Sequence, residues 1–107
     1  MPLLLKWKIW RIESRIRRLL VSQKIKPRVW SFGAYYIDPK HLVFVVGVSS
    51  DVEKNILKSN SDFPLKLKNL LKIYNWPLSA RESVIFDIES QETVNRETNG
   101  NWWYHYK

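Results

Sequence analysis

Two histidines are the first candidates for chemistry in this sequence. His41 falls in a predicted turn, Asp38-Pro39-Lys40-His41, where we expect it to be solvated. His105 lies in an alternating aromatic segment that predicts a strand. If this strand pairs with the one before it, His105 faces Asp87 and Glu89, and a histidine beside a carboxylate can do acid–base work. A surface histidine opposite solvated acids explains the same pattern, and we favour that interpretation.

Other catalytic patterns are missing from the sequence. There is no cysteine, so disulfides and thiol chemistry are excluded. The histidines and acids show no metal-ligand spacing, and the three glycines are scattered rather than gathered in a phosphate-binding loop. The serines stand in no nucleophile motif. We therefore expect a protein without enzymatic activity, without a cofactor and without a bound metal.

The positive charge is concentrated at one end of the chain. Residues 1–30 hold nine bases and one acid, a balance of +8, whereas residues 31–107 hold nine bases and nine acids. The net charge of +8 therefore belongs to the N-terminal segment. We expect any electrostatic partner to meet the protein there.

Residues 1–21 predict an amphipathic helix. Its apolar stripe repeats every three or four residues and consists of Leu5, Ile9, Ile12, Ile16 and Leu19, widened by Leu20. A parallel basic stripe consists of Lys8, Arg11, Arg15 and Arg18, while Trp7 and Trp10 fall away from the apolar side. These bases and tryptophans suit a binding surface for phosphates, an acidic protein or anionic lipid. The alternative is a helix whose bases are simply solvated.

The aromatic residues near the C-terminus form a second candidate binding surface. Trp102, Trp103 and Tyr104 lie within the predicted final strand, and its two faces are both aromatic. Strands favour aromatic residues, so packing in the core or at a sheet edge is one explanation. The other is an exposed face that binds a partner or a second copy, because aromatic anchors dominate interface energies.

The fold class follows from the order of these elements. Residues 42–48 contain no polar side chain and predict an interior strand, which requires cover on both faces. Residues 29–49 predict a β-hairpin, residues 51–74 a helical segment with a Ser50–Glu53 capping box, and residues 83–107 two C-terminal strands. We predict one domain, 1–107, with an α+β two-layer fold and a mostly antiparallel sheet of about four strands. The first helix supplies the second cover if the later helices lie on the opposite face.

These features favour a small interaction protein that binds a macromolecular partner, such as an adaptor, an inhibitor or an immunity-type protein. A partner protein or self-association is the first interpretation. Nucleic-acid binding through the basic helix is the alternative, and an enzyme using His105 is the third. The basic residues follow the short apolar start instead of preceding it, which is unlike a signal peptide. We therefore expect a cytoplasmic protein and disfavour a membrane partner.

Overall fold

Strand β2 (Val43–Val48) occupies the centre of a three-stranded sheet in the computed structural model, which describes the backbone of residues 2–106 and the side chains of residues 4–106. Strand β1 (Arg28–Phe32) pairs with it antiparallel, which confirms the predicted hairpin. Strand β3 (Ile85–Ser90) pairs with its other side in parallel. The α+β class is confirmed, but the expected four mostly antiparallel strands are wrong, because the sheet has three strands in mixed orientation.

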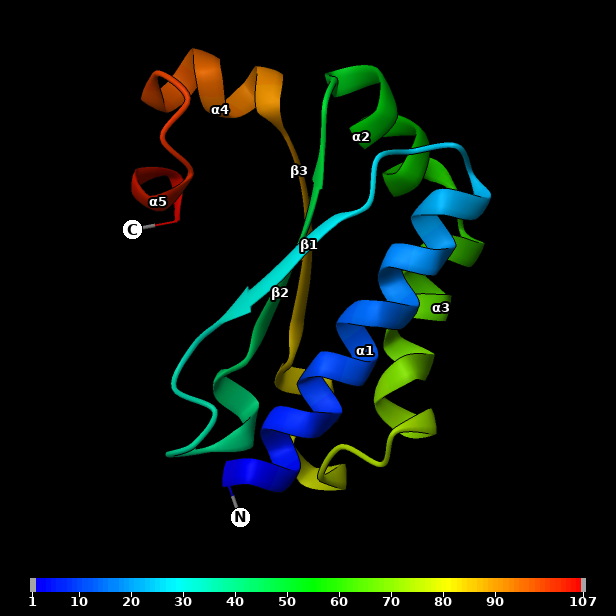
Figure 1. Cartoon of the computed structure of the whole chain (residues 1–107), viewed down its shortest axis with the longest axis vertical. Helices are drawn as coiled ribbons and strands as arrows, with labels where there is room; N and C mark the ends of the chain where they lie inside the picture. The colour runs from blue at the N-terminus through cyan, green and yellow to red at the C-terminus, as the bar shows by residue number, and fades with distance from the viewer. Residues whose placement is uncertain (1, 107) are drawn as a thin grey trace.

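Helices connect and cover these strands (Figure 1). They are α1 (Pro2–Ser22), α2 (Asp51–Ser59), α3 (Asp62–Ile73), α4 (Gln91–Thr98) and α5 (Trp102–His105). Short 3₁₀ turns occupy Pro39–His41 and Leu78–Ser83. The crossover through α2 and α3 carries the chain back to the starting end of β2, which is why β3 runs parallel to it.

One face of the sheet packs against α1 and α3. Strand β2 contributes Phe44, Val46 and Val48 to this core, and all three are buried. The predicted apolar stripe of α1 is confirmed, since Ile9, Ile12, Ile16 and Leu20 are buried while Leu5 and Leu19 are partly buried against the core. From α3 come Phe63, Leu67, Leu70 and Leu71.

The opposite face is covered by the end of the chain. Val45 on this face is 0% exposed, although it is absent from the main core. Figure 1 shows α1 and α3 on one side of the sheet and α5 on the other. The condition under which the first helix would supply the second cover is not met, because α1 lies on the same face as α3, and α5 covers the other face instead.

The predicted final strand is also wrong, because residues 102–105 form helix α5. Asn99 and Gly100 both have positive φ, which turns the chain after α4. The Asn101 side chain then accepts a hydrogen bond from the Tyr104 backbone N–H and caps α5. Aromatic residues at every position carry no clear period, so alternation alone did not separate strand from helix.

Local signals elsewhere were more reliable. The Ser50–Glu53 capping box forms at the start of α2. Asp38 accepts a hydrogen bond from the Lys40 backbone N–H, as expected of that turn. Strand β1 ends at Phe32, where the next residue, Gly33, has a φ of +115° and lies against the His41 carbonyl.

Candidate functional site

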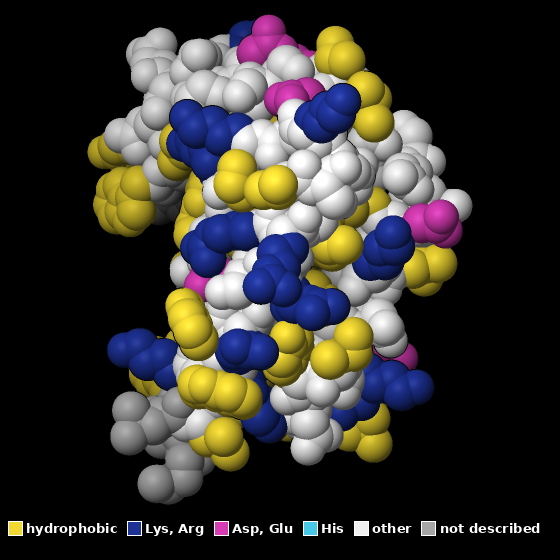
Figure 2. All heavy atoms as spheres, turned by 45° about the vertical axis from the view of Figure 1, so that its right-hand side comes forward, with side chains coloured by type: hydrophobic (Ala, Val, Ile, Leu, Met, Phe, Trp, Pro, Cys, Tyr) yellow, Lys and Arg dark blue, Asp and Glu magenta, His cyan; other side chains and the backbone are white. Residues whose placement is uncertain are grey.

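The basic residues predicted on the first helix form a surface with one neighbour from α3. Arg11, Arg15 and Arg18 are exposed, Lys8 is half-buried, and Arg15 lines a hollow of about 230 Å³ together with Lys66 of α3. We call these five residues the basic face. Figure 2 shows Lys and Arg side chains gathered over this side of the molecule, with hydrophobic side chains between them.

The two tryptophans of α1 accompany the basic face. Trp7 is 53% exposed and Trp10 is 56% exposed, so both lie at the surface, as the helical spacing predicted. The Arg11 guanidinium lies 5.8 Å from the ring centroid of Trp7 and 5.8 Å from that of Tyr74, just after α3. Cation–π attraction to both rings stabilises this position of the guanidinium. No sequence pattern indicated that Tyr74 would lie here, because the pairing depends on how α1 packs on α3.

Carboxylates do not neutralise this surface. Within residues 4–106, the acids in ion pairs lie elsewhere: Asp38 with Lys40, Asp51 with Arg96, Glu89 with Lys54 and His105, and Glu97 with His105. In that part of the chain, no carboxylate lies within 4.0 Å of the charged nitrogens of the basic face. Lys8 instead donates to the backbone carbonyl of Asn75 at 2.7 Å. The basic face therefore presents uncompensated positive charge.

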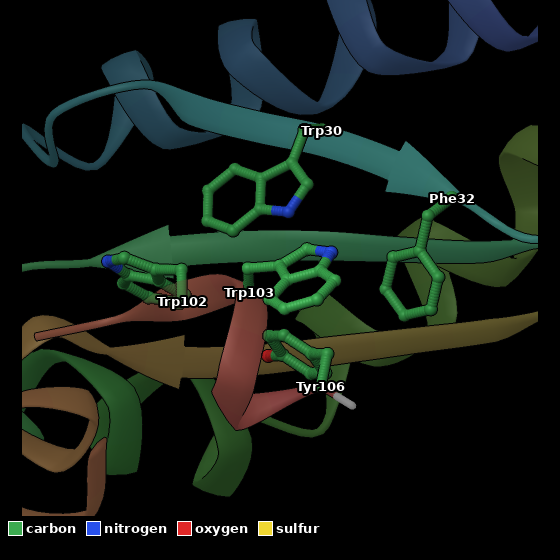
Figure 3. Close-up of a pocket in the computed structure, with 5 residues that line it drawn as sticks. All are labelled: Trp30, Phe32, Trp102, Trp103 and Tyr106. Atoms are coloured by element: carbon green, nitrogen blue, oxygen red, sulfur yellow. The ribbon is translucent and has the colours of Figure 1, made fainter.

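Aromatic side chains on the opposite side of the sheet form a pocket of about 450 Å³. It is lined by Trp30 and Phe32 from β1 and by Trp102, Trp103 and Tyr106 from the end of the chain, as Figure 3 shows. We call it the aromatic pocket. Of the predicted aromatic binding residues, Trp102 and Trp103 line the pocket. Tyr104 is not among the lining residues, and its ring lies 5.3 Å from that of Trp103. The alternating aromatic residues of β1 were visible in the sequence, but their position opposite α5 was not.

His105 and Glu89 do come together in space. His105 Nε2 lies 2.8 Å from Glu89 Oε2, and both side chains are only 11% exposed. Burial favours a raised pKa for the Glu89 carboxyl, but hydrogen bonds from Lys54, the Ser90 backbone and His105 lower that pKa below its ordinary value. Asp87 instead accepts a hydrogen bond from the Tyr106 hydroxyl at 2.7 Å. These contacts fasten the end of the chain to β3, and neither His105 nor Glu89 lines the aromatic pocket.

Asp51 is the centre of a second polar network. It accepts hydrogen bonds from the hydroxyls of Ser90 and Thr93 and from the Arg96 guanidinium, which lies 2.9 Å away. These bonds hold the pKa of the Asp51 carboxyl well below its ordinary value. The network joins the start of α2 to the start of α4. Each of the three partners lies 39 or more positions from Asp51 in the sequence, so no local sequence signal could have revealed the network.

Comparison with known protein families, with curated proteins and with solved structures found no match. Over the described residues, no group of three or more histidine, cysteine or acidic side chains is placed to hold a metal ion. None of the helices between residues 2 and 106 combines the length and apolar character that crossing a bilayer requires. Assignment of function therefore depends on the two surfaces themselves.

Proposed function

We propose that this protein is a non-enzymatic interaction protein that binds an acidic partner protein through the basic face. The observation that carries the proposal is the exposure of Arg11, Arg15 and Arg18 without a carboxylate partner within the described chain. Three guanidinium groups along one helix attract an anionic surface over a length of about two turns.

Exposed apolar side chains beside the bases favour a protein as the partner. Trp7 and Trp10 on α1 and Ile73 on α3 are each more than half exposed. Ile73 also lines the hollow that separates Arg15 from Lys66. Protein interfaces typically combine aromatic and arginine anchors with a polar rim, and this surface offers both.

A nucleic acid is the second candidate partner. It is favoured by the grouping of Arg11 with the rings of Trp7 and Tyr74, because aromatic rings and guanidinium planes both stack on bases. Arg15 and Arg18, farther along α1, would then contact the phosphates.

Matched charge variants test the proposal. The variant R11Q/R15Q/R18Q removes three positive charges from the basic face, and the control K26Q/K40Q/K58Q removes three from exposed sites elsewhere. Both change the net charge from +8 to +5, that is, 8 minus 3. Binding of each protein to labelled poly-glutamate, to single-stranded DNA and to anionic lipid vesicles is measured by fluorescence anisotropy or co-sedimentation.

The proposal predicts that the wild type binds poly-glutamate best, that the first variant loses this binding and that the control keeps it. If the wild type binds DNA more tightly than poly-glutamate, and only the first variant loses this binding, a nucleic acid is the partner instead of an acidic protein. Preferential binding to vesicles, no binding at all, or equal losses in both variants would overturn both candidates.

A further inference from the structure

The aromatic pocket lies on the other side of the sheet from the basic face. Its lining is aromatic and not basic, so it suits a different class of ligand from the acidic partner proposed above. We propose that it binds a small organic cation of the trimethylammonium class. The proposal is independent of the acidic partner, because none of the pocket residues belongs to the basic face.

Three of the five rings that line the pocket, those of Trp30, Trp102 and Tyr106, are held in position by contacts within the protein. The Trp102 indole N–H donates to Gln91 at 2.8 Å, and the Tyr106 hydroxyl donates to Asp87 at 2.7 Å. Trp30 lies directly on Gly47, where a Cβ would approach its ring to 2.9 Å. Trp102 then meets the Trp30 ring edge-on, with the centroids 4.9 Å apart. Because the polar tips of Trp102 and Tyr106 are occupied within the protein, these two residues offer a ligand mainly their ring surfaces.

Ring surfaces select cations among ligands of similar shape. The faces of Trp, Tyr and Phe rings carry partial negative charge and attract an ammonium group within about 6 Å of the centroid. Five such residues line a volume of about 450 Å³, which lies within the usual range for small-molecule pockets. No lysine, arginine, aspartate or glutamate is among the lining residues, so the pocket contains no strong partner for a phosphate or a carboxylate.

Charge around the pocket also favours a cation. Asp87 lies behind Tyr106, and within residues 4–106 no lysine, arginine or histidine nitrogen is within 4.0 Å of its carboxylate. Burial and this hydrogen bond raise the pKa of the Tyr106 hydroxyl, which therefore stays protonated and polarised toward the carboxylate.

The surroundings also place the ligand within the pocket. The Arg28 guanidinium lies 5.7 Å from the Trp102 centroid, so a protein cation already occupies the neighbourhood of that ring. Repulsion from Arg28 directs a second cation toward the other end of the pocket, beside the rings of Phe32 and Tyr106, which contact each other with their centroids 5.6 Å apart. An ammonium group there is also nearest to Asp87.

A pair of ligands with the same shape and different charge tests the proposal. Choline carries a trimethylammonium group, and 3,3-dimethyl-1-butanol is its neutral counterpart. Each is titrated into the 107-residue protein, and the tryptophan indole N–H signals are followed by NMR. We expect choline to bind at least about tenfold tighter than the neutral alcohol, as one strong cation–π interaction allows.

Two substitutions identify the groups responsible. Asp87→Asn keeps an acceptor for Tyr106 but removes the charge, and it should weaken choline binding severalfold. Glu82→Gln removes an exposed carboxylate of the turn before β3 and should leave binding unchanged. Trp103→Ala removes a ring from the exposed rim, without opening the core, and should also weaken binding.

Equal affinity for choline and the alcohol would overturn the proposal by showing a merely hydrophobic pocket. Unchanged choline affinity in both Asp87→Asn and Trp103→Ala would also overturn the proposal, because the ligand would then bind outside the aromatic pocket. Selective binding of a trimethyllysine peptide, with no binding of free choline, would overturn the assignment to a small molecule. The comparison of the two ligands on the wild-type protein decides the question even if a variant fails to fold.

Discussion

The contact between Gly47 and Trp30 makes a quantitative prediction about the sheet face under α5. In Gly47→Ala, the new Cβ would lie 2.9 Å from Cζ3 and 3.0 Å from Cη2 of Trp30. Ordinary van der Waals contact begins near 3.4 Å, so the indole must retreat by about 0.5 Å. Trp102, whose Cη2 would lie 3.6 Å from the Cβ, limits the room for that movement.

Two opposing effects set the free energy of this substitution. Overpacking a well-packed site typically costs about 1–3 kcal/mol. The φ of Gly47 lies outside the left-handed region, so alanine also stabilises by about 0.4–1 kcal/mol through the entropy of the unfolded chain. The net change ranges from near zero to a loss of about 2.6 kcal/mol. The single variant is therefore less informative than its coupling to Trp30.

A double-mutant cycle isolates the clash. In a Trp30→Leu background the ring is gone, and Gly47→Ala should stabilise by about 0.4–1 kcal/mol. The coupling free energy between the two positions should then be about 1–3 kcal/mol, measured by guanidinium chloride unfolding of the four proteins with unchanged m-values. Equal stabilisation by Gly47→Ala in both backgrounds would show that Trp30 does not lie on Gly47. It would thereby refute the arrangement of rings described for the aromatic pocket.

Three further predictions concern the core, a helix cap and acid stability. Ile16→Ala should cost about 2–5 kcal/mol of unfolding free energy in a urea titration, because Ile16 is 0% exposed, and a loss as small as that of exposed Val21→Ala would contradict the docking of α1. Ser50→Ala should cost about 0.5–2 kcal/mol in the same assay, and an unchanged midpoint would argue against the capping box. Folding lowers the pKa of Asp51, so its carboxylate stabilises the protein above the unfolded pKa of about 4, and this contribution is lost as the pH falls toward the folded pKa. The stability difference between wild type and Asp51→Asn should therefore be constant from about pH 5 to 7 and shrink in acid, whereas a difference that persists unchanged at low pH would refute the network.

The sequence predicted those elements whose signals are local. The three- and four-residue spacing from Ile9 to Leu20 placed the apolar side of α1 against the core. The unbroken apolar run of β2 required cover on both faces, and Val45 and Val46 are both fully buried. The capping box at Ser50 needed only its neighbours. Each of these patterns is fixed within a few residues.

Features that depend on distant partners were not predicted. The parallel pairing of β3 follows from the path of α2 and α3, and nothing in residues 85–90 specifies it. Helix α5 depends on the turn at Asn99 and on contacts with Gln91, Asp87 and Glu89. His105 and Glu89 were expected to be close only if two strands paired, and they meet through a helix that folds back over the sheet. The basic residues of α1 were therefore predictable as one surface, whereas Trp102 and Trp103 were named as binding candidates without their position opposite Trp30 and Phe32.

The most direct test of the central claim is an NMR titration of the ¹⁵N-labelled protein with poly-glutamate, following the side-chain Nε–Hε signals of the arginines. Binding through the basic face predicts the largest shifts at Arg11, Arg15 and Arg18. Arg96, which is already paired with Asp51, should barely respond. Shifts that are largest at Arg96, or that spread equally over all arginines, would contradict the assignment of this face as the binding surface.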